Sequence, residues 1–201
     1  MGILQQKPLV LASASPRRKD ILEQLGLTFR VLPSGIDETA LPGEQPAAHV
    51  ERLACEKAAE IATRLAAERD PACILAADTI VVINGQILGK PREDADALRM
   101  LRSLSGRTHR VITGVALAQP DGHVESAVFT TDVTFRKLDD RSARAYVMSG
   151  EGRDKAGSYA IQGFGAGLVT RVSGSYTNVV GLPAAETIDL LLSAGVLEAW
   201  P

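Results

Sequence analysis

Apolar residues along the chain follow two patterns, one typical of strands and one typical of helices, and segments with these patterns alternate. Short, nearly continuous apolar runs predict buried strands, whereas apolar residues spaced three and four apart predict helices with one buried face. After an apolar run at residues 9–12, strands are expected at residues 28–32, 73–83, 86–88, 108–118, 123–136 and 168–172. The expected helices cover residues 16–25, 46–69, 93–104, 139–148 and 183–193.

The turns between these segments indicate how the strands pair. Asn84-Gly85 lies between two short strands and predicts a hairpin. Residues 119–122 (QPDG) turn one long strand back on the next, whereas residues 149–167 are rich in glycine and polar side chains. We expect the latter to be a loop, long enough to indicate a function. Strands and helices that alternate around one long antiparallel hairpin predict an α/β fold with a mixed sheet.

Composition limits the class of protein. The chain has 201 residues, which suit one domain or two closely joined lobes. Aromatic residues make up only 4 % and the formal net charge is −2, so neither base stacking nor general nucleic-acid binding is favoured. Cys55 and Cys73 lie in apolar patterns and are expected to be buried thiols. With no signal-peptide core and no membrane-length apolar run, we expect a cytoplasmic protein without a membrane partner.

The first junction between a strand and a helix carries the clearest chemistry. An apolar run leads into Ser13, and Pro16 suits the first position of a helix whose N-cap is Ser15. Backbone N–H groups at this helix start, the Ser13 hydroxyl and the guanidinium groups of Arg17 and Arg18 together suit a polyphosphate. A capped helix with solvated arginines explains the same residues equally well.

Two charged residues interrupt strongly apolar patterns. Lys57 lies near the centre of the apolar stripe of the helix at 46–69, where it either extends to the rim or reaches an anion in a cleft. Asp78 interrupts the strand at 73–83. A buried carboxylate without a partner costs roughly several kcal/mol, so Asp78 needs a cation, a metal or hydrogen-bond donors. We favour the cleft for Lys57 and a functional carboxylate for Asp78, with a structural salt bridge as the alternative.

Weaker signals come from two glycine-containing segments. Gly89 and Pro91 flank Lys90, which they can hold extended and aimed at a fixed point. Gln162 precedes a glycine and can either read a base edge or cap backbone groups. No nucleophile-elbow, Walker or dinucleotide-binding motif occurs, and the histidines lack metal-ligand spacing. The residues that remain describe a cation-rich anion site that faces carboxylates.

Taken together, these segments resemble the Maf-like nucleoside triphosphate pyrophosphatases. The matching segments occur in order at residues 13–18, 56–58, 76–79, 88–91, 105–106, 113–114, 154–157, 161–163 and 174–183. The resemblance implies a mixed, twisted sheet with flanking helices and two lobes around a central cleft, similar to the inosine triphosphate pyrophosphatases. It also implies a single domain over residues 1–201 and a homodimer.

The resemblance implies a reaction and assigns residues to it. A nucleoside triphosphate is hydrolysed between its α and β phosphates to a monophosphate and pyrophosphate, with no nucleic acid as partner. Asp78 is the implied general base, and Ser13, Arg18, Lys57 and Lys90 are the implied phosphate-binding residues.

The same resemblance divides the family by substrate. The branch that prefers dTTP and UTP carries Ala-Asp-Thr and Ile-Gln-Gly, as this chain does, whereas the 7-methyl-GTP branch tends to have Gln after the Asp. Arg17, Thr79 and Gln162 are therefore the implied specificity residues. Residues 151–153 (EGR) depart from the Glu-Pro-Met of many relatives, which leaves the contacts of that loop open.

A divalent metal ion completes the expected chemistry. An isolated aspartate has a pKa of about 4 and is a weak base unless a metal ion first acidifies the water. We expect Mg²⁺ or Mn²⁺ bound by Asp78, with Glu38 and Glu151 as further candidate ligands. Three alternatives stay open: the same reaction on 7-methyl-GTP or other noncanonical nucleotides, a non-catalytic nucleotide-binding regulator of cell septation, and a nucleic-acid binder, which the net charge already disfavours.

Overall fold

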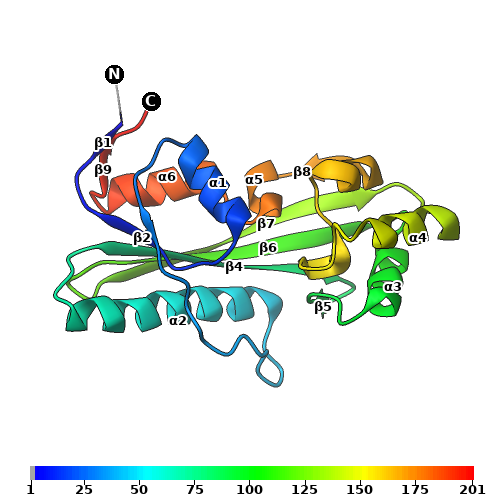
Figure 1. Ribbon diagram of the computed structural model, residues 1–201, viewed down its shortest axis with the longest axis horizontal. Coiled ribbons are helices and arrows are strands. Elements are labelled where there is room, and N and C mark those ends of the chain that lie inside the picture. Colours follow the sequence, from blue (N-terminus) through cyan, green and yellow to red (C-terminus); the bar gives the residue numbers. More distant parts are fainter. Residues whose placement is uncertain (1–2) are drawn as a thin grey trace. The chain divides into compact units, whose positions relative to one another are not determined.

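The computed structural model describes residues 3–201, which form a mixed α/β structure (Figure 1). The strands are β1 (Leu4–Gln5), β2 (Leu9–Leu11), β3 (Arg30–Val31), β4 (Cys73–Ile83), β5 (Gln86–Leu88), β6 (Thr108–Ala118), β7 (Val124–Phe135), β8 (Val169–Ser173) and β9 (Leu197–Ala199). The α-helices are α1 (Pro16–Gln24), α2 (Pro46–Ala67), α3 (Asp94–Leu104), α4 (Asp140–Ser149), α5 (Tyr176–Val180) and α6 (Ala184–Ser193). Two 3₁₀-helices, η1 (Ala156–Ser158) and η2 (Gly163–Leu168), lie between α4 and β8.

The main sheet combines parallel and antiparallel pairs. Hydrogen-bonded neighbours follow the order β3-β2-β4-β6-β7-β8, and β5 pairs with β4. Strand β2 is parallel to both β3 and β4, whereas β5 and β8 are antiparallel to their neighbours β4 and β7. The prediction of an α/β fold with a mixed sheet and flanking helices is confirmed.

The chain forms two compact units. The first contains the described residues up to Asp78 together with Thr113–Phe129 and Gly181–Pro201, and the second contains Thr79–Ile112 and Thr130–Val180. Strands β4, β6 and β7 each contribute residues to both units. Among residues 3–201, no helix combines the length and apolar character needed to cross a membrane.

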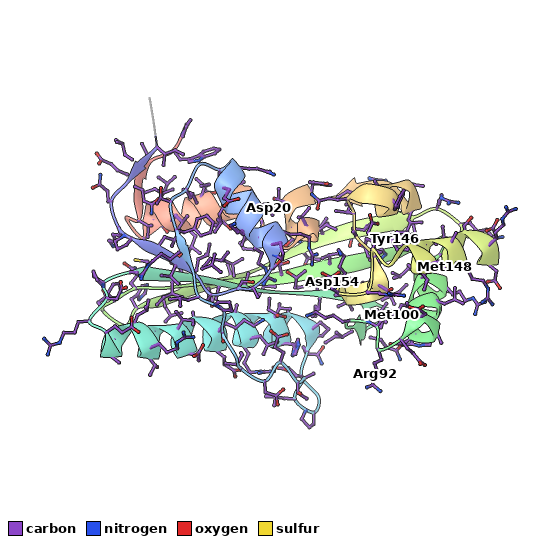
Figure 2. The ribbon with its side chains drawn as sticks, in the orientation of Figure 1. Asp20, Arg92, Met100, Tyr146, Met148 and Asp154 are labelled. Atoms are coloured by element: carbon purple, nitrogen blue, oxygen red, sulfur yellow. The ribbon has the colours of Figure 1, made fainter. Side chains whose placement is uncertain are left out.

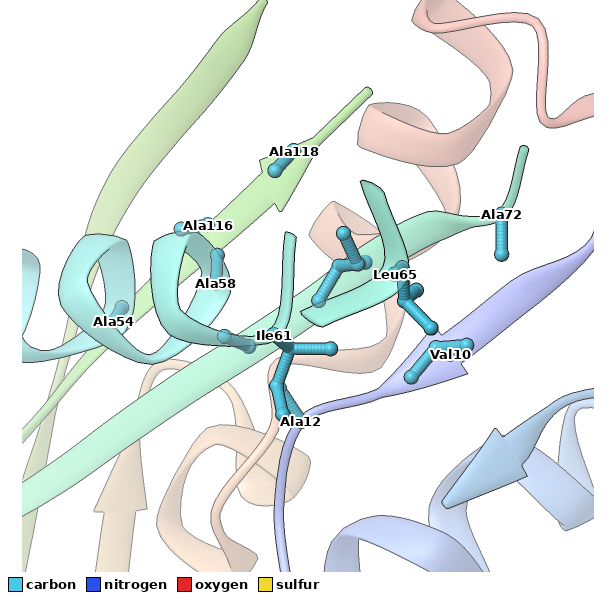
Figure 3. Packing of buried hydrophobic residues seen from close by; sticks show 11 residues of the cluster. Val10, Ala12, Ala54, Ala58, Ile61, Leu65, Ala72, Ala116 and Ala118 are labelled. Atoms are coloured by element: carbon cyan, nitrogen blue, oxygen red, sulfur yellow. The ribbon is translucent and has the colours of Figure 1, made fainter. Parts of the chain in front are cut away.

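The core of the first unit forms where helix α2 packs on strands β2, β4 and β6. Alanines are frequent in it, and their short side chains allow the helix to approach closely (Figure 3). The cluster comprises Val10, Ala12, Ala54, Ala58, Ile61, Leu65, Ala72, Ile74, Ala76, Ala116 and Ala118. The predicted apolar stripe of α2 is therefore the face that anchors the helix.

Gly114 on β6 lies directly against the backbone of this helix. A Cβ atom added at Gly114 would lie 2.3 Å from the backbone oxygen of Val50 on α2. We expect Gly114→Ala to lower the free energy of unfolding by about 1–3 kcal/mol, because backbone would have to move. Thermal unfolding measures the effect, at roughly 2–4 °C per kcal/mol for a chain of this size. Gly35→Ala is the control, since nothing lies within 4 Å of its added Cβ; equal midpoints for both variants would contradict the prediction.

The second unit contains an aromatic cluster. The rings of His109, Phe135 and Tyr159 contact one another edge to face, with centroids 4.7–5.3 Å apart. His109 is 2 % exposed, and its Nε2 shares a 2.7 Å hydrogen bond with the Tyr159 hydroxyl. Among the described residues its Nδ1 has no hydrogen-bond partner. Burial lowers the pKa of His109 from 6.5 to about 4.

This burial predicts an acid-sensitive contribution to stability. In the pH range between about 4 and 6.5 the unfolded chain binds the His109 proton and the folded chain does not, so stability falls as the pH falls through that range. Between pH 7 and pH 5 we expect a loss of about 2 kcal/mol from this residue. Urea unfolding at both pH values should show a smaller loss for His109→Gln, and an unaltered loss for the exposed control His123→Gln. Equal losses in wild type and His109→Gln would contradict the assignment.

The predicted elements agree with the structure where the pattern is strong. The bounds of β4, β5 and β6 are those predicted, and most helices differ by one or two residues at an end. The predicted loop at 149–167 lies between α4 and β8, and it contains η1 and the start of η2, which were not predicted. The strand expected at 28–32 is shorter, at Arg30–Val31. The short elements β1, β9 and α5 were not predicted.

Candidate active site

Lys57 forms the centre of a buried charge cluster in the first unit. Its Nζ lies 2.7 Å from Oδ1 of Asp78 and 2.6 Å from Oε1 of Glu38. The side chains of Lys57 and Asp78 are 8 % and 10 % exposed, whereas that of Glu38 is 53 % exposed. Lys57 therefore does not extend to solvent from its apolar helix face, and Asp78 has the cation that its burial requires.

The strand-to-helix corner lies in the same unit. Ser15 is the N-cap of α1 and Pro16 its first residue, as predicted, although the Ser15 side chain makes no capping hydrogen bond. Instead the Ser13 hydroxyl oxygen accepts from the Ser15 backbone N–H at 3.2 Å and from Nη1 of Arg18 at 3.0 Å. The Nε of Arg18 donates to the Gly181 carbonyl at 2.8 Å, so the buried guanidinium is fixed on two sides.

Electrostatics connect this corner with the Lys57 cluster. Burial lowers the pKa of Arg18, while the negative charges of Asp78 and Glu38 act in the opposite direction and the neighbouring Arg17 lowers it further. Arg18 nevertheless stays protonated, because a guanidinium is not deprotonated in proteins. The first unit thus contains both the positively charged side chains and the two carboxylates, and these charges act on one another. The residues concerned are Arg17, Arg18, Lys57, Asp78 and Glu38, and Ser13 is hydrogen-bonded to Arg18.

The remaining predicted residues belong to the second unit. Thr79 follows Asp78 on β4 and is half-buried, Lys90 is exposed after β5, and Gln162 is the exposed N-cap residue of η2. The backbone beside Lys90 is fixed, because the carbonyl of the preceding residue, Gly89, accepts a hydrogen bond from the Gly157 N–H at 3.0 Å. Two of the segments that carry the family resemblance, 88–91 and 154–157, therefore meet.

Glu151 holds the segment that carries Gln162. Its two carboxylate oxygens accept from the backbone N–H groups of Phe164 at 2.9 Å and Gly165 at 2.8 Å. Burial acts to raise the pKa of Glu151, but hydrogen bonds from Tyr146 and from these N–H groups outweigh it and lower the pKa. Figure 2 labels Tyr146 on α4. No pattern in the sequence indicated that Glu151 anchors η2. The role of Glu151 as a metal ligand stays a prediction.

Glycines make this loop geometry possible. Gly163 has φ +61°, and an added Cβ would lie 1.9 Å from Oε1 of Glu151. Gly152, where many relatives were expected to have proline, leaves no room either, since its Cβ would lie 2.1 Å from the Ser158 carbonyl oxygen. The loop that departs from the family pattern is therefore closely packed.

The carboxylates limit where a metal ion can bind. Within residues 3–201, no three His, Cys, Asp or Glu side chains lie together in a group that could hold a metal ion. Asp78 and Glu38 do approach a single cationic nitrogen, Nζ of Lys57. Carboxylate oxygens are the ligands that Mg²⁺ and Mn²⁺ prefer, so this pair has the right donor chemistry.

The architecture has a counterpart among solved structures. The Staphylococcus aureus Ham1 protein superposes with a TM-score of 0.54 over 94 % of this chain and 99 % of its own, at 16 % sequence identity. That similarity concerns the fold. The chain is thus an α/β protein with a fold similar to that of the Ham1 protein and with a buried lysine–carboxylate cluster of its own.

The sequence comparison specifies the family. The Maf-like protein family matches residues 8–194, so the chain belongs to this family. A dTTP/UTP pyrophosphatase of Myxococcus xanthus (strain DK1622) is 52 % identical over 195 residues, which cover 97 % of this chain and 96 % of that protein. A dTTP/UTP pyrophosphatase of Shigella dysenteriae serotype 1 (strain Sd197) is 49 % identical over 190 residues, 94 % of each chain. The resemblance seen in the sequence is confirmed.

Proposed function

We propose that this protein is a nucleoside triphosphate pyrophosphatase that converts dTTP and UTP to the monophosphate and pyrophosphate. The observation that carries the proposal is the buried Lys57–Asp78 pair, 2.7 Å apart, in a chain about half identical to relatives that bear this activity in their names. A buried ion pair is costly to maintain for stability alone. A cation beside a carboxylate is also what phosphoanhydride hydrolysis requires, because one neutralises phosphate charge and the other accepts a proton.

The residues divide the work by their chemistry. Lys57, Arg18 and the Ser13 hydroxyl bind phosphate oxygens, and Lys90 adds a further cation. The Asp78 carboxylate accepts a proton from the attacking water, whose oxygen forms a bond to the α phosphorus. The bond from that phosphorus to the oxygen shared with the β phosphate breaks, and pyrophosphate leaves with the electron pair.

We also propose a divalent metal ion at the carboxylates. Asp78 and Glu38 would hold it, with Glu151 as a weaker candidate, because its oxygens already accept two backbone N–H groups. When bound, Mg²⁺ or Mn²⁺ acidifies the water and neutralises phosphate charge. The oxygens of Asp78 and Glu38 would be its protein ligands.

Base recognition is assigned to Arg17, Thr79 and Gln162. The support is their chemistry and place: Gln162 presents an amide at the exposed start of η2, where Glu151 fixes the backbone. An amide offers one acceptor and two donors, which match the polar edge of a pyrimidine. Their joint action on one base is part of the proposal.

Several properties of the whole protein belong to the same proposal. We propose that residues 1–201 act as one Maf-like domain, that two copies form a homodimer, and that the enzyme works in the cytoplasm on free nucleotides. The net charge of −2 supports the last point, since a protein that binds nucleic acid generally is basic.

A substrate panel tests this function. The rate of pyrophosphate release is measured with Mg²⁺ or Mn²⁺ for dTTP, UTP, CTP, ATP, GTP, ITP and 7-methyl-GTP. We expect kcat/KM to be highest for dTTP and UTP. A kcat/KM that is highest for 7-methyl-GTP or ITP would instead assign the protein to another substrate branch of the family. Nucleotide binding without any hydrolysis would instead favour a regulatory binding protein.

A further inference from the structure

The segment between β3 and α2, residues 32–45, is largely exposed but is held along α2. Lys57 on the helix contacts Glu38 of the segment, and Arg52, further toward the helix start, donates from Nη2 to the Thr39 carbonyl at 3.3 Å. Later residues of the segment thus meet earlier residues of the helix. Figure 1 shows the segment passing α2 before it joins the start of that helix.

Glu44 is the main attachment point of this segment. Its Oε1 accepts from Nε of Arg52 at 2.6 Å and its Oε2 accepts from Nη2 at 2.8 Å, which is the two-pronged geometry of a strong arginine–carboxylate pair. Oε2 also accepts from the Leu41 N–H at 3.0 Å and lies 2.9 Å from Nδ1 of His49. The Glu44 side chain is only 8 % exposed. Hydrogen bonding to Arg52 lowers the pKa of Glu44 well below its usual range.

The same guanidinium reaches the residue next to Glu38. Arg52 holds the Thr39 carbonyl, and the Thr39 N–H and hydroxyl both donate to Oδ1 of Asp37, at 3.0 and 2.6 Å. The backbone on both sides of Glu38 is therefore fixed. The Glu38 side chain itself is half exposed, and an ion pair that exposed contributes little to holding a loop.

We propose that Arg52 is a positioning residue for the active site. Through its two bonds to Glu44 and its bond to the Thr39 carbonyl, it holds the Glu38 carboxylate against Lys57. Without Arg52 the segment is free to leave the helix, and Glu38 leaves the cluster with it. The inference rests on the proposed function, because it assigns Arg52 to the same charge cluster.

A double-mutant cycle tests whether Arg52 acts through Glu38. We expect Arg52→Gln to lower kcat/KM for dTTP about 10- to 100-fold, since small displacements at a reacting centre have effects of this size. Glu38→Gln should give a comparable loss, and the double variant should be no slower than Glu38→Gln alone. Arg52→Lys should be intermediate, because an ammonium cannot match the two-pronged contact. Losses that multiply in the double variant would overturn the proposal.

Hydrogen exchange of the nucleotide-free protein tests the ordering directly. Amides of residues 37–43 should exchange faster in Arg52→Gln and in the milder Glu44→Gln, and at the wild-type rate in Glu38→Gln. Arg64→Gln is the matched control on the same helix, since its contacts are with the Pro33 carbonyl at 3.4 Å and with Oε1 of Glu60 at 3.6 Å and not with residues 37–44. It should leave both the exchange at 37–43 and kcat/KM unchanged.

The two arms separate the possible failures. If wild-type protein hydrolyses no nucleoside triphosphate, the proposed function fails. The exchange experiment still decides whether Arg52 holds the segment, and unchanged exchange in both Arg52→Gln and Glu44→Gln overturns that. If wild type is active and Arg52→Gln keeps its full kcat/KM, the positioning role is wrong and the proposed function stands.

Discussion

Asp78→Asn should remove pyrophosphate release from dTTP while leaving the fold and nucleotide binding in place, because Lys57 keeps its 2.6 Å ion pair with Glu38. The amide has nearly the same shape as the carboxylate but accepts no proton from water. The loss of a general base typically lowers the rate about 10²- to 10⁴-fold. Steady-state rates with dTTP measure the effect, and calorimetric titration with a non-hydrolysable dTTP analogue measures binding.

The matched control is Asp20→Asn, an exposed aspartate on α1 (Figure 2). Its rate should equal that of wild type. Activity of Asp78→Asn within a factor of a few of wild type would contradict the assignment of Asp78 as the base.

Lys57→Met should reduce both activity and stability. The variant removes the cation that lies 2.7 Å from the buried Asp78 carboxylate. Removing one partner of a buried pair leaves the other charge uncompensated, which costs about 3–5 kcal/mol. Urea unfolding measures this loss, and dTTP turnover should fall by at least about 10²-fold, since a phosphate-binding charge in the site is lost.

A second substitution separates the two effects of Lys57→Met. Adding Asp78→Asn removes the uncompensated charge, so the double variant should regain most of the lost stability and none of the activity. Lys19→Met on α1 is the control, since the Lys19–Glu23 pair is about half exposed on both sides and should contribute little. A double variant as unstable as Lys57→Met would contradict the account of the pair.

Much of the fold follows from local patterns in the sequence. Strand β4 is an apolar run bounded by turn residues, and β5 follows an Asn-Gly turn in which both residues have positive φ. Helix α2 has an apolar stripe and proline at its first position. In each of these elements, propensity, pattern and turn chemistry agree.

The elements that were not predicted depend on contacts far along the chain. Strand β1 has two residues and exists because it pairs with β9 near the other end of the sequence. Helix η2 is a glycine-rich segment, held at its start by the Glu151 carboxylate. No apolar period marks either of them, so tertiary hydrogen bonds decide their conformation.

The candidate site likewise combines residues that the sequence pattern predicts with residues that only tertiary contacts reveal. Asp78 and Lys57 stand out in the sequence because each interrupts an apolar pattern, and the structure pairs them. Arg52 and Glu44 interrupt no apolar pattern. In the sequence Arg52 looks like an ordinary charge on an exposed helix face, and Glu44 like one in a loop. Only the fold shows that their side chains meet at 2.6 Å and hold the segment of Glu38.

The most direct measurement of the central claim is the identity of the products formed from dTTP by the wild-type protein with Mg²⁺ or Mn²⁺. Anion-exchange chromatography separates dTMP and pyrophosphate from dTDP and inorganic phosphate. Equal amounts of dTMP and pyrophosphate are the predicted result, because hydrolysis is assigned to the bond between the α and β phosphates. Release of dTDP and phosphate, or recovery of intact dTTP, would contradict it.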